Sequence, residues 1–401
     1  MSMMHRALWL GAILLVAALG GVVLVRRADP GTDVRNVTVG LYPRAVAVDA
    51  RTGLAFVVDG SFGRFIAPAG SVQTNSGSFA NGGGAFPSGG GAFPGEDGKV
   101  SVLDVSAARV LRTVSVGPDP RDVAVDERGG AVFVTNDDDA TVAVLDARSG
   151  ALERSIQVGS RPHALTVDPR EHRAFVVNSE DGTISVLDTI RQQVVHTFSA
   201  GERAAPDPTV VDAPAGRIIL SGSDGLQVLD ARLGTVVRSI ASGQTPDAVA
   251  VDPSSQLAYV AVDAGVSVLD LRSGRVLRSF AVAGGAPTAI ALDPRRGRLI
   301  VTHFGQVDAS GTPLGAGTAN VLDVRNGAVV GTFTVGVAPG AIAVDEATGR
   351  VVVVNQGGVV RASDPLGWVP SWLRRGLPFL KSGSSGTRSI PGSVSIFDLP
   401  R

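Results

Sequence analysis

Basic side chains recur directly after a proline in three successive repeats of this sequence. Arg44, Arg121 and His163 each follow the proline of a Gly-x-x-Pro turn. The equivalent positions of the other four repeats hold Thr209, Asp247, Thr288 and Gly340. If the repeats form a ring, the first three side chains lie on one arc, and such donors suit a carboxylate or a phosphate. The alternative is that they are solvated loop ends, and both interpretations stay open.

A second polar series ends the second apolar stretch of each repeat. It consists of Asp59, Asn136, Asn178, Gly222, Val262, His303 and Asn355. Carboxylates, amides and imidazoles are possible metal ligands, but nothing in the spacing selects a ligand set. Asparagine at a strand end is also an ordinary turn former. We therefore expect no metal and no cofactor, and Asn136, Asn178, Asp247 and His303 join the basic arc only as candidate ligand-binding residues.

Catalytic motifs are missing from the sequence. It has no G-x-S-x-G and no H-E-x-x-H, so we expect no catalytic residue. The absence of cysteine excludes disulfides, thiolate metal sites, a cysteine nucleophile and covalently attached c-type haem. The net charge is -1, which gives no electrostatic footprint for nucleic acid.

The elements that must position these residues are seven copies of one pattern. Each copy has a Gly-x-x-Pro-like turn, an apolar stretch ending in Asp, a second apolar stretch, and a third ending in Asp. The first aspartates are Asp49, Asp126, Asp168, Asp212, Asp252, Asp293 and Asp345, and the second are Asp104, Asp146, Asp188, Asp230, Asp270, Asp323 and Asp398. Short strands and turns repeated at this length predict an all-β, seven-bladed β-propeller. Aspartates before turns are explained by turn hydrogen bonds.

The two ends of the chain complement each other. The last repeat stops at VSIFDLPR, after its third strand, and residues 34–40 read as an orphan fourth strand ahead of the first repeat. Pairing them would close the ring and remove both exposed edges. We therefore expect an N-terminal strand to complete the last blade.

The repeats resemble those of YVTN-type β-propellers. The matching stretches are AVFVTN (131–136), AFVVN (174–178), VVVVN (351–355) and VSVLD (100–104 and 266–270). The resemblance implies a propeller related to extracytoplasmic and surface-layer proteins, with the amine dehydrogenase heavy subunit and lactonase-like enzymes among its relatives. It specifies architecture far more closely than activity.

Three long insertions fall between the second and third strands of consecutive repeats. We expect them at 61–98, 304–318 and 361–393, in the first, sixth and seventh repeats, which are neighbours in a closed ring. Long loops in compact repeats are often functional, so this sector is predicted to bind a partner protein. The candidate contact residues are Trp368, Trp372, Arg374 and Arg375. The alternative is that this last insertion caps its own blade.

An uncharged apolar run occupies residues 7–25 and is long enough to span a bilayer as one helix. Because it continues into Arg26 and Arg27 without a small-residue cleavage site, we expect an uncleaved anchor. Arg6 on its other side leaves the orientation open, and we favour a propeller outside the cytoplasm. The expected organisation is an anchor at 1–27, a linker at 28–33 and a propeller at 34–401.

The sequence thus predicts a membrane-anchored, extracytoplasmic and monomeric propeller that binds a protein or a ligand without catalysis of its own. Two alternatives stay open. One is a lactonase-like hydrolase, which would hold a divalent metal at the channel mouth. The other is a non-catalytic subunit of a redox complex, like the amine dehydrogenase heavy chain, with a cofactor-bearing partner.

Overall fold

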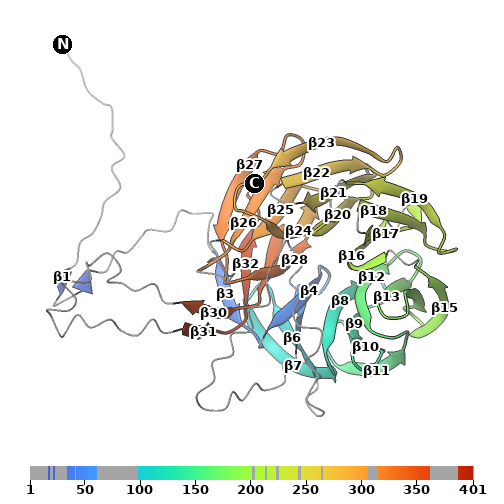
Figure 1. The fold of residues 1–401 in the computed structure, drawn as a ribbon. Helices are drawn as coiled ribbons and strands as arrows, with labels where there is room; N and C mark the ends of the chain where they lie inside the picture. Colours follow the sequence, from blue (N-terminus) through green and yellow to red (C-terminus); the bar gives the residue numbers. More distant parts are fainter. Residues whose placement is uncertain are drawn as a thin grey trace.

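A ring of seven four-stranded antiparallel sheets forms the body of the protein (Figure 1). The structure is a computed structural model, and it describes residues 17–18, 21–22, 34–40, 42–60, 98–200, 204–212, 215–222, 225–242, 245–262, 265–305, 315–361 and 387–400. The sheets are the blades of a β-propeller, with the first strand of each blade nearest the central axis (Figure 1). The predicted all-β, seven-bladed architecture is confirmed.

Each blade follows the repeat seen in the sequence. Blade 1 consists of β4 (Pro43–Asp49), β5 (Leu54–Asp59), β6 (Gly98–Asp104) and β7 (Arg109–Gly117). Blade 2 consists of β8 (Pro120–Asp126), β9 (Ala131–Asn136), β10 (Thr141–Asp146) and β11 (Leu152–Gln157). Blade 3 consists of β12 (Pro162–Asp168), β13 (Arg173–Asn178), β14 (Thr183–Asp188) and β15 (Gln193–Ser199). Blade 4 consists of β16 (Ala204–Asp212), β17 (Arg217–Gly222), β18 (Gly225–Asp230) and β19 (Val236–Ala241). Blade 5 consists of β20 (Ala248–Asp252), β21 (Leu257–Val262), β22 (Gly265–Asp270) and β23 (Arg275–Ala281). Blade 6 consists of β24 (Pro287–Asp293), β25 (Arg298–His303), β26 (Thr318–Asp323) and β27 (Val329–Thr334).

Blade 7 is built from both ends of the chain. Its strands are β28 (Pro339–Asp345), β29 (Arg350–Asn355), β32 (Ser393–Asp398) and β3 (Arg35–Thr38), in that order. β3 pairs with β32 in the register Val37↔Val394. The predicted closure by an N-terminal strand is therefore confirmed, and β3 covers the edge that β32 would otherwise expose.

The hydrophobic core is divided into seven clusters, one between each pair of neighbouring blades. Side chains on a strand alternate between its two faces, so β5 sends Ala55 and Val57 toward blade 7, and Phe56 and Val58 toward blade 2. The cluster between blades 7 and 1 also contains Val37 of β3. Every blade is thus packed on both faces, which explains the continuous apolar strands of the sequence.

The aspartates at the ends of the first and third strands stabilise turns. Asp146 Oδ1 accepts hydrogen bonds from the backbone amides of Arg148 and Ser149 at 3.2 and 2.6 Å, and Asp126 Oδ1 does the same for Arg128 and Gly129 at 3.0 and 2.9 Å. Because these turns follow strands that run in the same direction, all of them lie on one face of the ring, which we call the turn face. The second-to-third-strand connections lie on the opposite face, the insert face.

Most of the apolar run 7–25 lies outside the described residues. Within it, Ala17–Ala18 (β1) and Gly21–Val22 (β2) pair as two short antiparallel strands, where the sequence predicted helix. In the part of the chain that the structure describes, no helix has the length and apolar character needed to cross a bilayer.

The long connections between second and third strands run over 60–97 in blade 1, 304–317 in blade 6 and 356–392 in blade 7. In blade 7 the connection includes a two-stranded sheet of β30 (Gly358–Arg361) and β31 (Thr387–Ile390), which stands beside the blade (Figure 1). Residues 61–97, 306–314 and 362–386 lie outside the described residues. The partner-binding candidates Trp368, Trp372, Arg374 and Arg375 belong to this last range.

Candidate functional site at the channel mouth

Glycine turns on the insert face set the geometry of the mouth. A β-carbon on Gly117 would lie 2.5 Å from Nδ2 of Asn136 in blade 2, and Gly159 has the same relation to Asn178 in blade 3. Gly117 and Gly159 come at or after the end of a fourth strand, and each lies against the side chain that ends the second strand of the next blade. The contact therefore positions the proline that follows the glycine in the repeat, and the residue after that proline, at the mouth.

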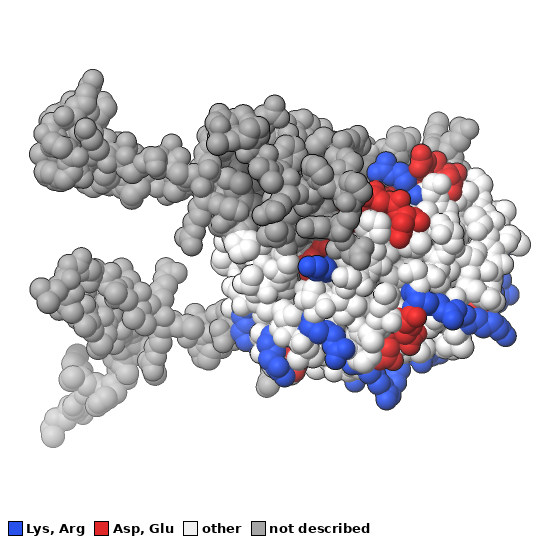
Figure 2. Space-filling model, turned by 90° about the horizontal axis from the view of Figure 1, so that it is seen from below, with Lys and Arg blue, Asp and Glu red and all other residues white. Residues whose placement is uncertain are grey.

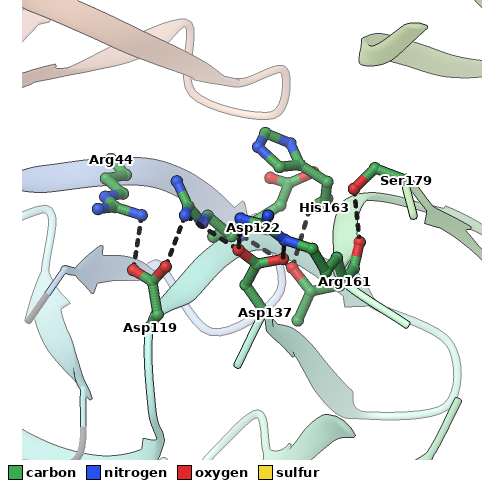
Figure 3. Close-up of polar contacts among 9 residues, drawn as sticks. Arg44, Asp119, Asp122, Asp137, Arg161, His163 and Ser179 are labelled. Atoms are coloured by element: carbon green, nitrogen blue, oxygen red, sulfur yellow. Dashed lines mark hydrogen bonds and ion pairs between the residues drawn. The ribbon is translucent and has the colours of Figure 1, made fainter. Parts of the chain in front are cut away.

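A row of alternating charges crosses the mouth from blade 1 to blade 3. Arg44 donates to Asp119 at 2.9 Å, and Arg121 donates to Asp119 at 2.5 Å and to Asp137 at 3.0 Å. Arg161 completes the row with a contact to Asp137 at 3.1 Å. The row is thus Arg44–Asp119–Arg121–Asp137–Arg161, and Figure 3 shows Arg44, Asp119, Asp137 and Arg161 with His163 near them. We call the five residues of this row the mouth row.

Burial makes the mouth row more than a surface ion pair. The side chain of Asp137 is 1% exposed and that of Asp119 is 15% exposed, so both carboxylates depend on the guanidinium groups for compensation. Burial, followed by repulsion from Arg121, lowers the pKa of Arg44, and the contact with Asp119 opposes this shift. The hydrogen bond to Asp137 raises the pKa of Arg161. The row joins three blades by charge as well as by apolar packing.

Carboxylates also gather at this point. Ligand atoms of Asp119, Asp137 and Asp138 lie within 4.8 Å of one another, a separation that a cation can bridge. Burial, and then the charges of Asp119 and Asp137, raise the pKa of Asp138. However, Asp119 and Asp137 already hold Arg44, Arg121 and Arg161, so the positive charge that they need is supplied by the chain itself.

The sequence found only part of this site. It identified Arg44, Arg121, His163 and Asp247 as the residues that follow the repeat prolines. In the structure all four side chains are half-buried. The backbone oxygen of His163 accepts a hydrogen bond from Thr135 at 3.0 Å. Sequence reasoning missed Asp119, Arg161 and Asp137. The available signal was position, because the first two directly precede the repeat prolines and the third follows the end of β9.

Three further candidates lie below the surface of the mouth. The side chains of Asn136, Asn178 and His303 are buried. Asn136 Nδ2 donates to Val116 O at 2.9 Å, and Asn178 Nδ2 donates to Ser185 Oγ at 2.9 Å. Burial lowers the pKa of His303, whose Nδ1 lies 3.1 Å from Gly285 O. Each side chain thus makes at least one hydrogen bond, whereas Asn136 Oδ1, Asn178 Oδ1 and His303 Nε2 are buried without a partner among the described residues.

Asp59 is the acidic member of the same series. It is buried at the end of β5, and Ser101 Oγ donates to its Oδ2 at 2.6 Å. Burial raises the pKa of Asp59 to about 6, although the hydrogen bond from Ser101 opposes the shift. Asparagine ends the second strand in blades 2, 3 and 7. Asp59 therefore places a carboxyl group where these blades place an amide.

The described ends of the three insertions lie on neighbouring blades. β28 contacts both β24 and β4, so blades 6, 7 and 1 follow one another around the ring. The insertions leave from His303, Asn355 and Asp59, which end the second strands of these blades on the insert face. The order predicted from ring closure is therefore confirmed for the described ends.

Comparisons with known proteins leave the activity open. No family model matches the chain, and no curated protein matches it. Among solved structures 1604 chains match, so the fold by itself does not select one activity. One is Kuenenia stuttgartiensis hydrazine synthase, with 18% sequence identity and a TM-score of 0.49 over 68% of this chain and 86% of that one. The YVTN-type assignment therefore stays a resemblance of the repeats.

Proposed function

We propose that this protein is a membrane-anchored, extracytoplasmic β-propeller that binds a partner protein on its insert face and has no catalysis of its own. The apolar run 7–25 supports the anchor. Three observations support the binding role: the closed ring, the grouping of the insertions, and the internally neutralised mouth.

The grouping of the insertions carries the proposal. Closure by β3 makes blades 6, 7 and 1 consecutive, and all three long connections start on the same face. Four-stranded blades require only short turns at these places, as blades 2 to 5 show. Added chain concentrated on one sector of a rigid ring is the usual way in which a propeller acquires a binding surface.

The mouth is the second place for a ligand. Arg44, Arg121, His163 and Asp247 stay candidates for a small anion, but an anion must compete with Asp119 and Asp137 for the guanidinium groups. The lactonase-like alternative is less well supported, because Asn136, Asn178 and Asn355 are buried, each in its own blade. We place the redox-complex alternative within the binding proposal, since its chemistry would belong to the partner.

The test is cross-linking and affinity capture from native membranes. The intact protein is compared with a variant in which residues 61–97, 306–314 and 362–386 are replaced by short turns. We expect a defined partner to be captured by the intact protein and lost with the shortened variant. A matched control shortens only 306–314, and identical thermal unfolding of all forms shows that the ring is preserved.

Equal capture by the intact and shortened proteins would contradict the insert-face proposal. Metal analysis of the purified protein then becomes decisive. A stoichiometric divalent cation that is lost on Asp119→Asn/Asp137→Asn substitution would support the hydrolase alternative instead.

A further inference from the structure

The geometry points to the turn face as a docking surface for an anionic phospholipid bilayer. This inference rests on the proposed membrane anchor and adds the orientation of the propeller on the membrane. It concerns only described residues of the turns that join the first to the second strand and the third to the fourth strand in each blade.

Arginines project from these turns in blades 1 to 6. The exposed ones, which we call the turn-face arginines, are Arg51, Arg128, Arg148, Arg170, Arg191, Arg232, Arg272, Arg295, Arg296 and Arg325. Figure 2 views the ring from the side and shows basic side chains along its lower edge, with few acidic ones between them. Among the described residues, Arg148, Arg272 and Arg325 make no salt bridge within 4.0 Å, although Arg148 and Arg272 act at longer range on Asp146 and Asp270.

The acidic residues of the same turns are of two kinds: one group is buried, whereas the side chains of Glu171, Glu346 and Asp398 are 59, 46 and 67% exposed. Asp49, Asp126, Asp168, Asp293 and Asp345 are buried. In the turns between the third and fourth strands, which we call the outer turns, the aspartates accept hydrogen bonds from backbone amides. Asp230 Oδ1 accepts them from Arg232 and Leu233 at 2.8 and 2.9 Å. These hydrogen bonds lower the pKa of Asp230. Glu171 and Glu346 pair with Arg232 and Arg295 at 3.9 and 3.5 Å, so a flat anionic partner would meet chiefly the turn-face arginines outside these pairs.

Two large apolar side chains project among the arginines. Leu233 is 69% exposed and Ile190 is 57% exposed. They lie in the turns between the third and fourth strands of blades 4 and 3, respectively. Each adjoins a turn-face arginine, Arg232 or Arg191. Exposed apolar tips flanked by arginine are typical of surfaces that insert a few side chains into a headgroup layer.

The entry of the chain brings this face to the membrane. Arg35 begins β3 and donates to Ser106 O, in the outer turn of blade 1, at 2.7 Å. The chain preceding β3 therefore joins the ring at the turn face, opposite the insertions. Residues 26–34 span at most about 30 Å when extended, which keeps the turn face close to an anchor at 7–25. The face nearest the anchor is thus the one with projecting arginines, and anionic headgroups complement it.

The experiment uses the full-length protein reconstituted into vesicles of phosphatidylcholine, with or without phosphatidylglycerol. Because the chain has no cysteine, a Leu233→Cys variant takes a single polarity-sensitive fluorophore. Flotation with the vesicles reports the anchor, and quenching by a headgroup-attached quencher reports contact of the turn face. Ser179→Cys, an exposed site on the insert face, is the labelling control.

We expect flotation with both kinds of vesicle, and quenching at position 233 only when phosphatidylglycerol is present. Arg148→Glu/Arg272→Glu/Arg325→Glu should abolish this quenching without affecting flotation, since each basic residue near an anionic surface strengthens association by about fivefold. Arg112→Glu/Arg154→Glu on the outer strands should leave it unchanged.

Flotation without any quenching at position 233 would overturn the docking surface while leaving the anchor intact. Quenching that survives the triple substitution, or that is equal at position 179, would also overturn it. Failure to float with either kind of vesicle would overturn both the anchor and the docking surface.

Discussion

Asp59 lies directly beneath Gly40, so that a β-carbon at position 40 would be 2.6 Å from Asp59 Cγ. Gly40 follows the closing strand β3, and Asp59 ends the second strand of blade 1, where the first insertion departs. Ring closure and the base of an insertion therefore meet in one contact. The same relation joins Gly117 to Asn136, Gly159 to Asn178, Gly284 to His303 and Gly336 to Asn355.

Substitution of a repeat glycine tests this contact. Gly117 has φ +138° and faces Asn136 Nδ2, so Gly117→Ala creates both backbone strain and a steric overlap. We expect a loss of about 1–3 kcal/mol in the free energy of unfolding, measured by urea denaturation. Gly315→Ala is the control, because a β-carbon there meets nothing within 4 Å. Equal stability of the two variants would contradict the contact.

Asp59 should make stability depend on pH. Its pKa is raised from 3.8 to about 6 in the folded protein, so the folded state binds the proton more tightly than the unfolded chain. The resulting stabilisation is complete below the unfolded pKa and is lost as the pH rises through about 6. We expect Asp59→Asn to remove this dependence and to raise stability at neutral pH by up to about 3 kcal/mol.

Thermal unfolding of the Asp59→Asn variant at acidic and neutral pH checks this expectation. Asp188→Asn provides a control of opposite sign. Backbone hydrogen bonds from its turn lower the pKa of Asp188, so its contribution is present at neutral pH and is lost as the pH falls. A wild-type protein whose stability does not decrease between about pH 4 and about pH 6, relative to Asp59→Asn, would refute the assignment.

The mouth row should stabilise the junction of blades 1 to 3. Arg121→Ala leaves Asp119 without one of its two partners and leaves the buried Asp137 dependent on Arg161. We expect a loss of about 2 kcal/mol, because an incompletely paired buried charge is costly. The control is Arg191→Ala, whose pair with Asp188 is on the surface and should contribute less than about 0.5 kcal/mol. Denaturant unfolding of both variants decides the comparison.

An anion at the mouth should compete with the carboxylates of the row. We expect inorganic phosphate to raise the melting temperature more in Asp119→Asn/Asp137→Asn than in the wild-type protein, because these changes free Arg44 and Arg121. Replacing Arg44, Arg121 and His163 by alanine should remove any effect of phosphate. A phosphate response that persists in the triple-alanine variant would place the anion elsewhere.

Closure of the ring can be tested on β3. Val37 is 9% exposed and packs with Val394 and Ile396, so Val37→Asp buries a charge in the cluster between blades 7 and 1. We expect a loss of at least about 3 kcal/mol. Val195→Asp changes a 44% exposed residue on β15, the corresponding outer strand of blade 3, and should cost less than about 1 kcal/mol. Similar losses in both variants would argue against closure by β3.

The sequence alone determined the architecture. The paired aspartates fixed the number of blades, and the unpaired ends fixed the closing strand, because apolar alternation and turn chemistry are local properties of the chain. The same local reasoning assigned Asn136 and Asn178 to strand ends. It could not tell that Asn136, Asn178 and His303 would be buried beneath glycine turns, since that depends on how the turn folds back over the blade.

Only the tertiary structure decided the character of the mouth. Arg44 and Arg121 read as a positive arc in the sequence, but Asp119 and Asp137 come from a turn and a strand end in blade 2 and neutralise them across the ring. The Arg44–Asp119 pair joins residues 75 positions apart, and the complete row forms only when three blades pack side by side. Periodicity determines which residues face the axis, and the distances between blades determine which charges meet there.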